Sequence, residues 1–110
     1  KPEVGGADLG PRPTGLLLSA LGGCTGMDVV SILAKMRVPL EGFRGEVEAP
    51  LPDLHPRVYS AVHLRYVFKG RDLPMDKLER AVQLSQERYC GVSAMLAKAA
   101  PVTHEILLEA

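Results

Sequence analysis

Two cysteines are the side chains of this sequence best suited to chemistry, because a thiolate is a strong nucleophile. Cys24 and Cys90 are the two cysteines among 110 residues and lie 66 positions apart. That spacing leaves three interpretations open: two unrelated core thiols, a structural disulfide, or a redox pair in which one thiol attacks a peroxide and the other resolves the product. No signal peptide is recognisable, so we expect a cytoplasmic protein, in which structural disulfides are rare.

The residues around Cys24 predict a long helix over Leu16–Arg37. On a helical wheel Cys24 lies on the most polar stripe, which it shares with Asp28, Ser31 and Lys35 at offsets of 4, 7 and 11. This position favours a thiol that faces a cleft, with a structural cysteine as an equal alternative. Asp28, one turn from the thiol, would raise its pKa, so activation of Cys24 requires a cation from elsewhere.

Another side of the same helix carries Gly22 and Gly26, one turn apart. A glycine costs about 1 kcal/mol relative to alanine inside a helix, so this pair predicts a close approach of backbone or sheet. The same side carries Leu18, Thr25, Val29 and Leu33. About 20 apolar residues can cross a membrane, but the central Asp28 makes a buried helix of a soluble protein the better interpretation.

The remaining patterns predict one α+β domain over residues 1–110, with the element order α-β-β-α-α-β. After the first helix we expect strands at 43–49 and 58–68. A helix should then start near Pro74, with a buried stripe of Leu78, Ala81, Val82, Ser85 and Tyr89. A helical piece at 92–100 and a strand at 102–109 should end the domain. The two strands are expected to form an antiparallel hairpin, with Arg44, Glu46 and Glu48 opposite His63 and Arg65 on a solvent face. A break at Gly91 predicts partial exposure of Cys90. Residues 1–15 predict a loop, which we interpret as the end of a truncated N-terminal strand region.

Composition excludes several classes of protein. The 13 basic and 13 acidic residues cancel, without the basic cluster of a nucleic-acid binder. A hydrophobic content of 46% is typical of a folded domain rather than a disordered one. The absence of asparagine favours a thermophilic source. No His, Cys and Asp spacing resembles a metal site, and we expect neither a metal nor a cofactor.

Three stretches resemble the OsmC/Ohr superfamily, from about Gly10 to the C-terminus: ALGGCTGMDVVSILAKMR, HPRVYSAVHLRYVFKG and AVQLSQERYCGVSAMLAKAAPVTHEI. The resemblance implies an intertwined homodimer in which a long central helix packs against an antiparallel sheet. It also implies thiol-dependent reduction of organic hydroperoxides in the oxidative stress response. Where the characterised members have a glutamate that holds an activating arginine, this chain has Pro13, Thr14 and Gly15.

Carried over by position, Cys24 is implied to be the peroxidatic cysteine and Cys90 the resolving cysteine. An external dithiol would then reduce their disulfide. Met27 and Met95 are either core residues or the lining of a pocket for the apolar part of a hydroperoxide. The main alternative is a non-catalytic module of the same fold that binds a small apolar or thiol-bearing ligand at the dimer cleft. A dimer with inert thiols is a third interpretation.

Two further side chains near the expected site have a structural and a functional interpretation. His104 shares a strand face with Val102, Ile106 and Leu108, which favours a core position over one that lines the cleft. Glu87 precedes Cys90 by three residues and could orient a cation, but a solvated helix face is the favoured interpretation.

Overall fold

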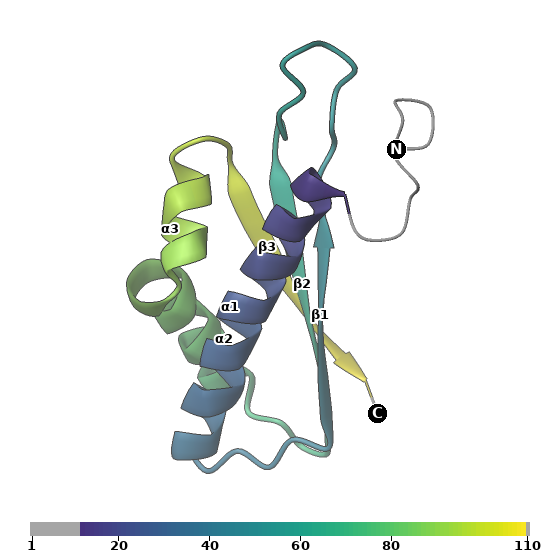
Figure 1. The fold of residues 1–110 in the computed structure, drawn as a ribbon. Helices are drawn as coiled ribbons and strands as arrows, with labels where there is room; N and C mark the ends of the chain where they lie inside the picture. The colour runs from purple at the N-terminus through teal and green to yellow at the C-terminus, as the bar shows by residue number, and fades with distance from the viewer. Residues whose placement is uncertain (1–11, 110) are drawn as a thin grey trace.

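The computed structural model describes residues 12–109 and contains the expected element order. The helices are α1 (Pro13–Lys35), α2 (Met75–Leu84) and α3 (Gly91–Ala97), and a π-helical turn (Ser85–Tyr89) follows α2 directly. The strands are β1 (Gly42–Glu48), β2 (Val62–Lys69) and β3 (Val102–Glu109). Figure 1 shows the three helices gathered in front of one sheet, with α1 lying obliquely across it. The fold is therefore α+β with two layers.

The sheet has the strand order β1-β2-β3. The expected hairpin is confirmed: β1 and β2 are antiparallel, with Glu46 opposite Arg65 and Glu48 opposite His63. The expectation of a purely antiparallel sheet was wrong, because β3 pairs with β2 in parallel. A parallel neighbour requires a crossover connection, and the segment of α2, the π turn and α3 supplies it. This crossover carries the second cysteine over the face of the sheet, beside α1.

Helix α1 starts at Pro13, three residues before the predicted start at Leu16. Most of the loop predicted over residues 1–15 lies outside the described residues. Proline suits the first helical turn because its missing N–H would have no partner there. The expected close contact is confirmed, and it is with the sheet. A Cβ atom on Gly22 would lie 3.2 Å from Val47 Cγ2, and one on Gly26 would lie 3.4 Å from Phe43 Cε2. The glycines thus let α1 approach β1.

The predicted buried stripe after Pro74 is confirmed for Leu78, Ala81, Val82 and Ser85, each of which is fully buried. Tyr89 contradicts the prediction, since 59% of it is exposed. The π turn at Ser85–Tyr89 explains the difference. A π turn takes in an extra residue, so the face that follows it no longer continues the 3.6-residue period.

The prediction of a core position for His104 was also wrong. It is exposed on β3, and its ring is nearly perpendicular to that of Tyr66, with centroids 6.0 Å apart. The buried core instead lies between the helices and β2, where Leu64, Tyr66 and Phe68 are almost fully covered.

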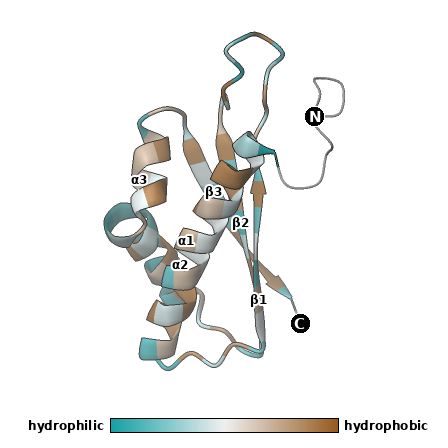
Figure 2. Ribbon diagram, in the orientation of Figure 1, coloured by the Kyte–Doolittle hydropathy of each residue, from teal (hydrophilic) through white to brown (hydrophobic). Residues whose placement is uncertain are grey.

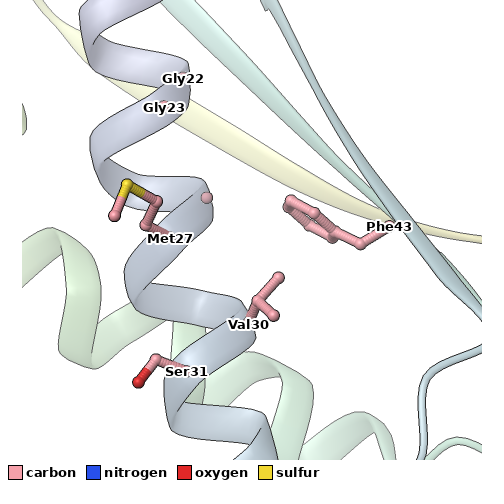
Figure 3. A pocket seen from close by; sticks show the side chains of 7 residues that line it. Gly22, Gly23, Met27, Val30, Ser31 and Phe43 are labelled. Carbon is pink, nitrogen blue, oxygen red and sulfur yellow. The ribbon is translucent and has the colours of Figure 1, made fainter.

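One face of α1 is apolar but uncovered in the single chain. Its exposed large residues are Leu16, Met27 and Val30. By length and composition α1 could cross a membrane, and 28% of its most apolar window is buried in the chain. Figure 2 shows hydrophobic colouring over much of α1, most strongly near its N-terminal end. An open hollow of about 540 Å³ runs beside this face, between α1 and Phe43 of β1 (Figure 3).

Candidate active site

The two cysteines meet at one place in the fold. Cys24 lies in the middle of α1 and is half-buried, and Asp28 follows it by one turn. Cys90 is the residue that precedes α3, and its sulfur lies near Cys24 of α1. The two sulfur atoms and a carboxylate oxygen of Asp28 all lie within 4.8 Å of one another. The structure therefore brings together three groups that the sequence places on two separate segments.

The π turn places the Cys90 sulfur. The Cys90 N–H donates a 2.7 Å hydrogen bond to the carbonyl oxygen of Ser85, which closes the wide turn. The backbone of Cys90 is extended, and its sulfur accepts a hydrogen bond from the N–H of Ser93 at 3.4 Å. Cys90 is only 2% exposed, so the expectation of partial exposure was wrong. The turn directs the side chain inward, toward α1.

A chain of hydrogen bonds leads from the Asp28 carboxylate into the core of the protein. Ser85 Oγ donates to Asp28 Oδ2 at 3.1 Å. Thr25 Oγ1 lies 2.7 Å from Ser85 Oγ and 2.7 Å from the Tyr66 hydroxyl. Gln86 Nε2 donates to the same hydroxyl at 2.5 Å. One consistent set of donors runs from Gln86 through Tyr66, Thr25 and Ser85 to the carboxylate, since a carboxylate only accepts.

Sequence reasoning missed this hydrogen-bond chain, because its members come from three elements. Burial raises the pKa of Tyr66, which therefore stays a neutral donor. A neutral, fully bonded chain of this kind fixes the position of Asp28 and of the helix turn that carries Cys24.

The electrostatic surroundings of Cys24 disfavour its thiolate. Hydrogen bonding to Cys90 and burial raise its pKa, and the negative charge of Asp28 raises it further. The backbone N–H of Val92 acts in the opposite direction. Within residues 12–109, no cation contributes to this shift. The part of the chain that the structure describes thus contains the thiol pair without the positive group that activation requires.

Part of the polar stripe of α1 borders a hollow. Asp28, Ser31 and Lys35 line an opening of about 530 Å³ together with residues of α2 and the π turn. Asp28, which lies beside both sulfur atoms, borders this opening, but neither cysteine is among the residues that line it.

Met27, Met95 and Glu87 are the remaining candidate residues from the sequence. Met27 and Phe43 both line the separate hollow beside β1 (Figure 3). Met95 is 67% exposed on α3. Neither methionine is a core residue in this chain, and a role for either in binding substrate stays a prediction. Glu87 is exposed, as expected for a solvated face.

The arrangement permits two kinds of chemistry. A disulfide requires a sulfur–sulfur bond of about 2.05 Å, which the two thiols can reach by a local movement. Two thiolates and a carboxylate are also ligand types that bind divalent metal ions. Spacing along the sequence did not indicate the second possibility, because Cys90 is remote from Cys24 and Asp28 in the chain.

Comparison with known proteins places this geometry in a family. Residues 5–105 match the family described as OsmC-like protein. The chain belongs to the OsmC-like family. Its relatives include the Escherichia coli protein YhfA, 39% identical over 97 residues, which are 88% of this chain and 72% of that protein.

Solved structures show the same OsmC-like fold. A hypothetical protein from Aquifex aeolicus is 32% identical with a TM-score of 0.82, over 94% of this chain and 79% of that one. An organic hydroperoxide resistance protein OsmC from Legionella pneumophila shares the fold at 16% identity, with a TM-score of 0.68 over 97% of this chain and 77% of that one.

Proposed function

We propose that this OsmC-like protein is a cysteine-based peroxidase that reduces organic hydroperoxides. The observation that carries the proposal is the convergence of the Cys24 and Cys90 sulfur atoms within 4.8 Å, on elements that are far apart in sequence. Membership of the OsmC-like family supports it. The name of the Legionella protein, which refers to organic hydroperoxide resistance, indicates the substrate class.

The proposed reaction starts at Cys24, since it is the more accessible thiol and Cys90 is 2% exposed. The Cys24 thiolate attacks the terminal peroxide oxygen, and the O–O bond breaks. The sulfur becomes a sulfenic acid, and the leaving alkoxide takes a proton to become an alcohol. The Cys90 thiolate then attacks the sulfenic sulfur, which forms the disulfide and releases hydroxide, and the hydroxide takes a proton from solvent to become water. An external dithiol reduces the disulfide by thiol–disulfide exchange and is itself oxidised.

We also propose that the functional unit is a homodimer. The uncovered apolar face of α1, which includes Met27 and Val30, is the surface we assign to the second copy. A contiguous apolar patch of this kind is typical of an interaction surface. Pairing through this face would enclose the hollow beside β1 and leave the polar stripe with Asp28 open to substrate.

The direct test is consumption of cumene hydroperoxide by the reduced protein with dithiothreitol as the external dithiol. We expect turnover by the parent and none by Cys24→Ser. Without dithiothreitol, Cys90→Ser should consume a single equivalent, because nothing then reduces its sulfenic acid. Asp53→Asn is the control, because it changes an exposed carboxylate in the loop between β1 and β2, away from the thiol pair. Equal turnover by Cys24→Ser and the parent would overturn the proposal.

A second candidate is the non-catalytic module that binds a small apolar or thiol-bearing ligand. The observation that favours it is the raised pKa of Cys24, with no cation contributing to the shift within residues 12–109. A binding module requires no thiolate, whereas a peroxidase does. If both thiols of the reduced protein survive excess hydroperoxide at neutral pH, the binding module becomes the better candidate.

A further inference from the structure

The cluster formed by Cys24, Asp28 and Cys90 has the composition of a zinc site. Zinc is bound by cysteine sulfur at about 2.3 Å and by carboxylate oxygen at about 2.0–2.2 Å. Two sulfurs on one tetrahedral ion are therefore roughly 3.8 Å apart. The three candidate atoms already lie within 4.8 Å of one another. A contraction of about 1 Å at most is required, which rotation of the side chains can supply.

We propose that the reduced protein binds one zinc ion through Cys24, Asp28 and Cys90, with a fourth position open to water or another ligand. Two of the ligands are one turn apart on α1, so one helix face holds them in place. The third is fixed by the hydrogen bonds that close the π turn and start α3.

Outer hydrogen bonds orient these ligands, as is usual for metal sites. The Ser85 hydroxyl donates to one oxygen of Asp28, and a carboxylate has a second oxygen free to bind an ion. The N–H of Ser93 donates to the Cys90 sulfur, a bond that a thiolate accepts equally well.

The charge of the cluster is the second argument for an ion. Two thiols and a carboxyl group, each of which becomes negative when it loses its proton, converge on one point. A divalent cation at that point would stabilise both thiolates.

Zinc binding involves no electron transfer. Each thiol releases its proton to solvent as the ion binds. A disulfide between the cysteines removes two ligands, so the oxidised protein is expected to bind no zinc. The inference stands apart from the proposed peroxidase, because it concerns the reduced thiols in the absence of peroxide.

The test uses untagged, metal-free protein under anaerobic, reducing-agent-free conditions. Zinc is titrated against a chromophoric chelator, and the loaded protein is measured by X-ray absorption. We expect one equivalent of bound zinc, with two sulfur neighbours at about 2.3 Å and lighter neighbours at about 2.0 Å. Absence of competition with the chelator, or a shell of nitrogen and oxygen alone, would overturn the inference. This measurement needs no substitution, so it does not depend on any variant folding.

Variants then assign the ligands. Removing an outer-shell partner of a metal typically costs about 10–100-fold in affinity, so loss of a direct thiolate should cost more than roughly 100-fold. We expect this for Cys24→Ser and Cys90→Ser, and a smaller loss for Asp28→Asn. Asp53→Asn, an exposed carboxylate in the loop between β1 and β2, is the control and should leave the affinity unchanged. Equal affinity in the parent and in Cys90→Ser would contradict the assignment.

Discussion

Thr25 Oγ1 lies 2.7 Å from Ser85 Oγ, and this buried hydrogen bond joins α1 to the start of the π turn. Thr25 is the neighbour of Cys24, and the backbone of Ser85 accepts the N–H of Cys90. The two hydroxyls therefore hold together the segments that carry the two thiols. Both side chains are 1% exposed or less, so the bond has no competition from water.

Loss of the Ser85 hydroxyl is expected to destabilise the fold. In Ser85→Ala, Thr25 and Asp28 each lose a hydrogen-bond partner, and a buried group left unsatisfied costs about 1–3 kcal/mol. Urea unfolding should show a loss of that size. Ser31→Ala, on the exposed part of the α1 stripe, should change the free energy of unfolding by no more than about 0.5 kcal/mol. Equal effects of the two substitutions would show that the Thr25–Ser85 bond is not structural.

The reactivity of Cys24 is expected to increase at higher pH than that of a free thiol. Its pKa is raised, chiefly by Cys90, so the reactive thiolate forms only as the pH rises above the usual range. The rate of alkylation of Cys24, followed by mass spectrometry from pH 6 to 11, gives the midpoint, which is the pH at which half of the thiol is ionised.

The Cys90→Ala variant tests the cause of that shift. Removal of the neighbouring thiol should move the Cys24 midpoint to lower pH, since its hydrogen bond and charge both raise the pKa. A midpoint in the parent protein below that of a free thiol would contradict the expectation. It would mean that a positive charge outside residues 12–109 activates Cys24.

The close packing of α1 on β1 predicts an asymmetry between glycines of one helix. A side chain at Gly22 meets Val47, whereas one at Gly15 meets nothing within 4 Å. Gly22→Leu should lose about 1–3 kcal/mol relative to Gly15→Leu, as overpacking usually does. Thermal unfolding of the two variants gives the comparison. Indistinguishable midpoints would show that α1 can move away from the sheet at little cost.

The proposed dimer predicts that a charge on the α1 face separates the subunits. Val30 is 42% exposed there in the single chain. Burial of an unpaired carboxylate is costly, so Val30→Glu should sediment as a monomer at concentrations where the parent is a dimer. Leu54→Glu is the control, because Leu54 is 81% exposed in the loop between β1 and β2. A monomeric parent, or dimeric Val30→Glu, would exclude this face as the interface.

Periodicity alone predicted much of the fold. The alternation of Phe43–Ala49 and the positions of Val29 and Leu33 each reflect local geometry, and the structure agrees with them. Such patterns could not predict that β3 pairs with β2 in parallel. The sequence of a strand does not specify the direction of the strand beside it. Tyr89 failed for a different reason, since a π turn has no established sequence signal and breaks the helical period.

The candidate site was predicted only in part. Cys24 and Asp28 could be placed on one stripe because they share a helix. That Cys90 reaches the same point depends on the π turn and on the crossover past α1, which are tertiary features. The resemblance to the OsmC/Ohr superfamily supplied the pairing that periodicity could not.

The most direct test of the proposed function is the thiol content of the reduced native protein before and after one equivalent of cumene hydroperoxide. A redox pair predicts the rapid loss of both thiols, a mass decrease of two hydrogens, and a Cys24–Cys90 linked peptide. In Cys90→Ser the same treatment should leave a sulfenic acid at Cys24 that a dimedone probe traps. Two intact thiols after the treatment, at a pH where Cys24 is alkylated readily, would contradict the peroxidase.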